Sequence, residues 1–149
     1  MPYRMLLVDD DEGVLASLRR VLHRESEFVL QTAGGGAEAL AAIDAWRPDL
    51  MLLDVQMPGL SGHEVCRRIR ADACHRFLKV ILVSGRCNTS DRLAGYQAGA
   101  DDFLSKPFDI DELLAKARVF ARLKHAEELD EIKGSLLTLF AHETRTPLT

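Results

Sequence analysis

Short apolar segments that end in a polar residue recur along this chain, and they constrain its fold more than any other feature. Residues 5–8, 50–53 and 80–83 are continuous apolar runs, and an aspartate or a serine follows each of them directly. Apolar residues spaced by three and four lie between these runs, which indicates amphipathic helices. Short apolar strands alternating with helices are typical of a parallel sheet that helices cover on both faces. We therefore expect an α/β fold in which ligands bind at the carboxyl ends of the strands.

The expected elements form five successive β-α units. We expect strands at residues 5–8, 28–30, 50–53, 80–83 and 103–104. We expect helices at residues 14–22, 37–46, 64–70 and 93–98, and a last helix after Asp109. Asp11 directly precedes the first helical pattern, so we expect it to cap that helix, and Gly99 is expected to follow the fourth helix as its C-terminal cap.

The composition is that of an ordinary globular chain with an acidic balance. Its 149 residues suffice for a domain of ordinary size, and 19 basic against 23 acidic residues give a net charge of −4. This balance argues against a nucleic-acid partner. No apolar run is long enough to span a bilayer, and the apolar stretch near the start is too short for a signal peptide. We therefore expect a cytoplasmic chain with no nucleic-acid and no membrane partner.

The cysteines do not predict a disulfide framework or a zinc site. Cys66, Cys74 and Cys87 are odd in number, and no pair has the spacing of a Cys-x-x-Cys motif. A metal site made of Cys66, Cys74 and His75 would lack the four closely spaced ligands that soft-ligand sites use. We expect reduced cysteines that fill gaps between elements.

The polar residues at the strand ends predict a site with a specific chemistry. Asp9, Asp10 and Asp54 converge at one edge of the expected sheet, where three carboxylates repel one another unless a cation neutralises them. Oxygen ligands of this kind suit Mg²⁺. An aspartate can attack phosphorus and form an aspartyl-phosphate, while a lysine and a hydroxyl stabilise the transferring group. Lys106 and Ser84 are the lysine and the hydroxyl available at strand ends.

These motifs together resemble the receiver domain of two-component response regulators over about residues 4–122. The residues that carry the resemblance are 6–11 (LLVDDD), 48–59 (PDLMLLDVQMPG), 82–85 (LVSG) and 98–108 (AGADDFLSKPF). The resemblance implies a flavodoxin-like fold, which is a doubly wound five-stranded parallel sheet, or (βα)5. Here it is expected to carry a long C-terminal helical extension.

The family implies a phosphorylation site at Asp54. Asp54 would accept a phosphoryl group from a phosphohistidine, which makes a histidine kinase or a phosphotransfer protein the expected partner. Asp9 and Asp10 would hold Mg²⁺ together with Asp54, and the main-chain carbonyl of Gln56 would be a further ligand.

The family also implies roles for residues at the ends of the last two strands. Ser84 would bond a phosphate oxygen on activation, and Phe103 would be the aromatic side chain that rotates with it. For Phe103, a plain core aromatic on a short strand is the alternative. Lys106 would pair with the phosphate, and the peptide bond before Pro107 is typically cis in this family.

The helical pattern does not stop at the expected end of the receiver near residue 122. Leu129, Ile132, Leu136 and Leu139 alternate spacings of three and four, as in a coiled-coil seam. A parallel homodimer through this helix is our expectation. The alternative is a single amphipathic helix that packs on its own domain.

The last residues, LFAHETRTPLT at 139–149, are similar to the H-box that opens the phosphotransfer domain of sensor histidine kinases. The resemblance implies that His142 is a kinase phosphoacceptor, that Glu143 orients or deprotonates its ring, and that Thr146 positions water for phosphatase action. Ala141 and Thr144 depart from the usual H-box pattern, and an ordinary surface histidine is the alternative for His142.

These patterns predict a receiver over 1–122 and a helical extension with a truncated H-box over 123–149. We expect a fragment of a hybrid sensor histidine kinase, in which the receiver regulates the attached kinase through the helix. Without an ATP-binding domain, the chain is not expected to autophosphorylate, so its standing as an enzyme is open. The main alternative is a degenerate receiver that acts only as a dimerisation or interaction module. An aspartate-dependent phosphohydrolase fits less well, because Gln56 stands where its second aspartate would be.

Overall fold

The computed structural model describes residues 2–86 and 88–145, with side chains described as far as Ala141. Five parallel strands form one sheet in the order β2-β1-β3-β4-β5. The strands are β1 (Tyr3–Val8), β2 (Phe28–Ala33), β3 (Leu50–Asp54), β4 (Lys79–Ser84) and β5 (Asp102–Ser105). The helices are α1 (Glu12–Leu22), α2 (Gly36–Trp46), α3 (Gly62–Ala71), α4 (Thr89–Gln97) and α5 (Ile110–Arg145), with a short 3-10 turn η1 (Ala73–His75). The expected flavodoxin-like α/β fold is confirmed.

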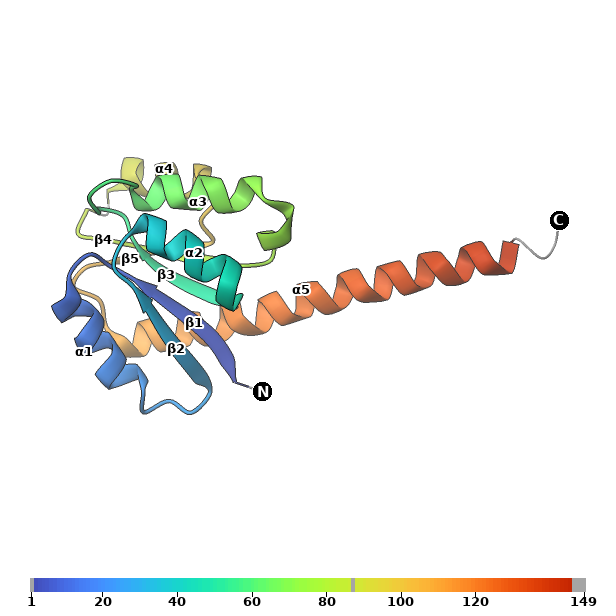
Figure 1. Ribbon diagram of the computed structural model, residues 1–149, viewed down its shortest axis with the longest axis horizontal. Helices are drawn as coiled ribbons and strands as arrows, with labels where there is room; N and C mark the ends of the chain where they lie inside the picture. The colour runs from blue at the N-terminus through green and yellow to red at the C-terminus, as the bar shows by residue number, and fades with distance from the viewer. Residues whose placement is uncertain (1, 87, 146–149) are drawn as a thin grey trace.

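Helices cover both faces of the sheet. In Figure 1, α1 and α5 lie on one face, and α2, α3 and α4 lie on the other. Alternate residues of β1 therefore enter different cores: Leu6 and Val8 pack toward α2 and α3, whereas Met5 and Leu7 pack toward α1 and α5. Burial on both faces explains why the central strands consist of continuous apolar residues.

The observed elements differ from the expected ones mainly at their ends. Asp11 caps α1 as expected, because its Oδ1 accepts hydrogen bonds from the backbone N–H groups of Gly13 and Val14. The fourth helix begins at Thr89 rather than at residue 93, because Asn88 caps it by accepting from the N–H of Asp91. Strand β2 extends to Ala33, and η1 was not predicted.

The last helix, α5, is longer than the body of the domain requires. Its first turns pack on the sheet through Leu113, Ala117 and Ala121, which are fully buried. Its second half projects from the domain (Figure 1), and its apolar side chains are exposed there, from Leu129 to Phe140. No helix among the described residues is both long and apolar enough to cross a membrane.

Ion pairs hold α5 to the amino ends of the central strands beyond the expected receiver boundary. Lys124 Nζ lies 2.7 Å from Oδ1 of Asp49, just before β3. Glu127 accepts two hydrogen bonds from Lys79 Nζ, at 2.9 and 2.8 Å, at the start of β4. The domain body therefore contacts α5 at least five residues past position 122.

Candidate functional site

The carboxyl ends of β1, β3 and β5 bring Asp9, Asp54 and Lys106 together. Asp9 follows β1, Asp54 ends β3, and Lys106 follows β5. The Lys106 ammonium lies 3.0 Å from Oδ2 of Asp9 and 3.4 Å from Oδ1 of Asp54. Both aspartates are only 5% exposed, so their charges are poorly screened by water. The predicted convergence of these three residues is seen in the structure.

Burial and charge shape the ionisation of this site. Burial, and then the negative charge of Asp9, raise the pKa of Asp54 above its ordinary value, although Lys106 and the backbone N–H of Gln56 act in the opposite direction. Burial alone would lower the pKa of Lys106, but its hydrogen bond to Asp9 and the charges of Asp54 and Asp9 raise it overall. Lys106 therefore remains a cation between two carboxylates at neutral pH.

The raised pKa of Asp54 predicts a stability effect with a definite sign. Folding disfavours the ionised Asp54 carboxylate, so the residue destabilises the metal-free protein above its unfolded pKa, and this penalty fades as pH falls through the folded pKa. Asp54→Asn is therefore expected to raise the melting temperature in EDTA at pH 7 by at least about 2 °C. The gain should shrink near pH 4, about the ordinary carboxyl pKa. Asp130→Asn, on exposed α5, is the control, and a fall in the melting temperature of Asp54→Asn would contradict this explanation.

The acidic residues fit a hard divalent cation. Asp9, Asp10 and Asp54 each offer a carboxylate oxygen, and these oxygens lie within 4.8 Å of one another. Oxygen-only donors with one or two buried carboxylates are the ligands that Mg²⁺ prefers. The Gln56 main chain lies beside Asp54, to which its N–H donates. Coordination by the Gln56 carbonyl stays a prediction.

Two further predicted site residues, Ser84 and Phe103, lie at the neighbouring strand ends. Ser84 ends β4, is buried, and its Oγ accepts a hydrogen bond of 3.0 Å from the N–H of Arg86. Phe103, in β5, is buried in the core against Gly95 of α4, where an added Cβ would lie 3.2 Å from its ring. The core role of Phe103 is therefore present, and its rotation stays a prediction. The peptide bond between Lys106 and Pro107 is cis, as the resemblance implied.

The predicted H-box residues are not placed at this site by the structure. Thr146 lies outside the described residues. His142 and Glu143 belong to the helical backbone of α5, and their side chains are not described. Their roles stay predictions.

The cysteines agree in part with the expectation that they fill gaps. Cys66 is buried in the core, and burial raises the pKa of its thiol to about 11, which makes it unreactive at neutral pH. Cys74 is exposed, and Cys87 lies outside the described residues.

The sequence analysis missed the residues that attach α5 to the sheet. Asp49, Lys79, Lys124 and Glu127 form ion pairs between positions 48 and 75 residues apart. The sequence analysis used Asp49 only as part of the 48–59 segment that carries the family resemblance. The available signal was a charged residue beside the start of two central strands, Asp49 before β3 and Lys79 in β4. Both residues are buried, and a buried charge needs a partner of opposite charge.

Comparison with known proteins identifies the family. The sequence matches the family described as "Response regulator receiver domain" over residues 5–118. This chain belongs to the response regulator receiver family. The match includes all the strand-end residues described above.

Individual relatives agree with this assignment. "Response regulator MprA" of Mycobacterium ulcerans is 42% identical over 149 residues, which is 100% of this chain and 62% of that protein. The signal receiver domain of a putative LuxO repressor protein from Vibrio parahaemolyticus is 25% identical with a TM-score of 0.80, over 88% of this chain and 98% of that one. A receiver domain of a signal transduction histidine kinase from Syntrophus aciditrophicus is 27% identical with a TM-score of 0.74, over 80% and 90%.

The relatives support the predicted receiver but not the predicted kinase fragment. The receiver assignment is confirmed. The curated relatives are named response regulators, and this chain spans about 62% of the length of the first of them. They do not support the expectation of a hybrid-kinase fragment, and the H-box resemblance remains unconfirmed.

Proposed function

We propose that this receiver accepts a phosphoryl group on Asp54 from a phosphohistidine in a reaction that depends on Mg²⁺. The observation that carries the proposal is the Lys106 ammonium between the buried Asp9 and Asp54 carboxylates. A purely structural strand end has no reason to gather three carboxylates and a lysine at a cost in electrostatic repulsion. The proposal therefore favours a working phosphorylation site over a degenerate interaction module.

The residues of the site would divide the work of phosphoryl transfer. An oxygen of Asp54 forms a bond to phosphorus while the bond from phosphorus to the imidazole nitrogen breaks, and that nitrogen keeps the electron pair. Lys106 stabilises the negative charge on the transferring group, and Ser84 lies at the neighbouring strand end to bond a phosphoryl oxygen. Asp9, Asp10 and Asp54 would hold Mg²⁺, which supplies positive charge beside the phosphoryl oxygens when it is bound.

A surface beside the site suits the approach of a donor protein. A groove lies between α1 and the start of α5, and Lys106 stands at its edge. Its apolar lining includes Val14, Leu18, Phe108 and Ile110. A helical donor that carries the phosphohistidine would bury this lining while its imidazole reaches Asp54.

The phosphorylated state would be passed on through α5. Phosphorylation would bias the arrangement around Ser84 and Phe103, and α5 would carry the change to an attached output, for which we propose a histidine kinase. The exposed apolar seam of α5, from Leu129 to Leu139, supports a parallel homodimer. In this proposal His142 is the kinase phosphoacceptor, with Glu143 and Thr146 as its helpers, and the chain acts in the cytoplasm.

The MprA relatives favour a second candidate for the output. Their similarity covers all of this chain, including α5, and about 38% of the length of the first relative lies outside the match. An output module of a response regulator, in place of a kinase, would then receive the signal from α5. The receiver chemistry at Asp54 is the same in both cases.

Intact mass spectrometry after incubation with acetyl phosphate tests the phosphorylation itself. The wild-type chain is expected to gain one phosphoryl group with Mg²⁺ and none with EDTA. Asp54→Ala is expected to gain none, because the variant lacks the proposed acceptor carboxylate at the end of β3. No gain by the wild-type chain would contradict the proposal and favour the interaction module.

A further inference from the structure

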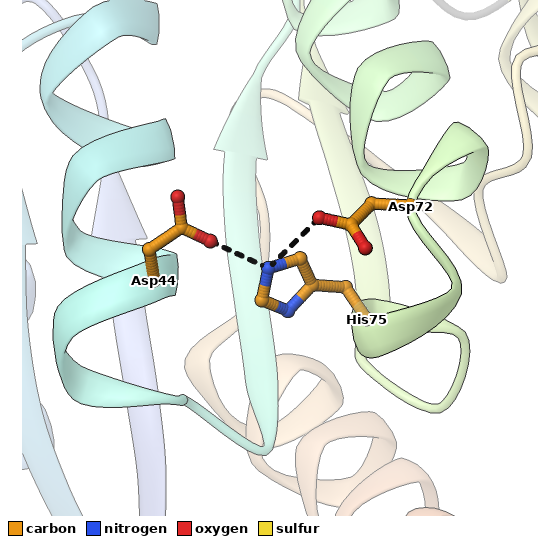
Figure 2. A group of neighbouring side chains, drawn as sticks. All are labelled: Asp44, Asp72 and His75. Atoms are coloured by element: carbon orange, nitrogen blue, oxygen red, sulfur yellow. Dashed lines mark hydrogen bonds and ion pairs between the residues drawn. The ribbon is translucent and has the colours of Figure 1, made fainter.

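A second cluster of potential metal ligands lies near the amino ends of the strands, whereas Asp54 lies at their carboxyl ends. His75, in η1 before β4, faces Asp44 near the end of α2 and Asp72 at the end of α3 (Figure 2). Its Nε2 lies 2.7 Å from Oδ1 of Asp44 and 3.8 Å from Oδ2 of Asp72. Figure 2 shows both carboxylates directed at the same ring nitrogen.

The donor atoms of this cluster have the spacing of a metal site. In a tetrahedral zinc centre, with ligand bonds of about 2.0–2.2 Å, neighbouring donor atoms lie about 3.3–3.6 Å apart. The two distances from His75 Nε2, 2.7 and 3.8 Å, lie on either side of this range. A small adjustment of the exposed Asp44 side chain, which is 73% exposed, would make all three donors fit one ion.

Burial makes His75 the fixed part of the site. Its side chain is only 7% exposed, so it is held in one orientation, with Nε2 directed toward the two carboxylates. Asp72 is also fixed, because its Oδ1 accepts a hydrogen bond of 2.9 Å from the N–H of Cys74, which leaves Oδ2 toward His75.

Two other clusters of three potential metal ligands occur among the described residues, and in each of them a lysine lies between the carboxylates. Lys106 lies between Asp9 and Asp54 at the phosphorylation site. Asp49, His125 and Glu128 also form such a group, but Lys124 lies between Asp49 and Glu128, at 2.7 and 3.2 Å. No lysine or arginine among the described residues forms an ion pair with Asp44 or Asp72. His75 is the side chain that both carboxylates contact.

We propose that Asp44, Asp72 and His75 bind a divalent transition-metal ion, with zinc as the best match to one imidazole and two carboxylates. Water would complete the coordination, since Asp44 and Asp72 are exposed. The ion would link α2 to the segment between α3 and β4, which α5 also contacts through Arg76 and Glu131. This site is independent of Asp54, so the failure of one proposal leaves the other standing.

Zinc titration of the full chain by calorimetry tests the site. Millimolar Mg²⁺ is kept in the buffer to compete with zinc for the acidic site at Asp54. The wild-type chain is expected to bind one equivalent of Zn²⁺, and Asp44→Asn is expected to weaken this binding at least about tenfold. Asp130→Asn, an exposed aspartate on α5, is the matched control and is expected to bind like the wild type.

The melting temperature with and without zinc tests the role of the buried ligand, His75. His75→Gln is expected to abolish the zinc-dependent rise in melting temperature, and circular dichroism checks that this variant is folded. Because Asp44 is exposed, Asp44→Asn keeps the test valid even if His75→Gln does not fold. Equal zinc affinity in the wild type and in Asp44→Asn would overturn the proposal, as would the absence of zinc binding by the wild type.

Discussion

Lys106→Met is expected to slow the acetyl-phosphate-dependent phosphorylation of Asp54 by about two to three orders of magnitude, the effect of removing one preorganised charge-stabilising donor. The structure gives the reason. Lys106 Nζ is the cation that lies within 3.4 Å of Oδ1 of Asp54, where negative charge gathers as the phosphoryl group arrives. The rate of mass gain with saturating Mg²⁺ measures the effect.

Lys116→Met provides the control for this variant. Lys116 is also partly buried, but it pairs with Asp102 and Glu112 away from Asp54. Its loss should leave the phosphorylation rate within about twofold of the wild type. A Lys106→Met rate equal to that of the control would show that Lys106 is not part of the transfer chemistry.

Glu127→Gln is expected to destabilise the protein by about 1 to 3 kcal/mol, because it removes the carboxylate that accepts two hydrogen bonds from the buried Lys79 and leaves it paired with the more distant Asp101, at 3.9 Å. Lys79 is only 6% exposed, whereas Glu127 is reached by water, so we expect less than the full effect of breaking a buried ion pair. Urea denaturation measures the free energy of unfolding, and it reports how firmly α5 is attached to the sheet.

Glu128→Gln is the neighbouring control on the same helix. Glu128 forms an i,i+4 pair with Lys124 at 3.2 Å, and Lys124 keeps Asp49 as a partner when Glu128 is changed. A loss of about 0.5 kcal/mol or less is expected. If both variants lose the same stability, the contact between Lys79 and Glu127 does not anchor α5.

The fold and the main site could be predicted from sequence because both depend on local order along the chain. An apolar run such as residues 50–53 followed at once by Asp54 indicates both a buried strand and the residue at its carboxyl end. The parallel sheet then places Asp9 and Asp54 together without further information. The start of α4 was missed because its cap, Asn88, lies before any apolar periodicity begins.

The contacts between distant elements could not be predicted in this way. Asp49 and Lys124 are 75 residues apart, and no periodicity relates them. His75 was considered only together with cysteines, whereas in the structure it contacts Asp72, three residues before it, and Asp44, 31 residues before it on α2. Such contacts depend on how helices pack against the sheet, which the pattern of apolar residues determines only approximately.

Chemical identification of the phosphorylated residue tests the central claim most directly. An aspartyl-phosphate is a mixed anhydride, so borohydride reduces the modified aspartate to homoserine, and peptide sequencing by mass spectrometry then locates it. After treatment with acetyl phosphate and Mg²⁺, we predict homoserine at position 54 and an intact aspartate at positions 9 and 10. Homoserine at another position, or a chain that carries phosphate but no homoserine, would contradict the assignment of Asp54 as the phosphoacceptor.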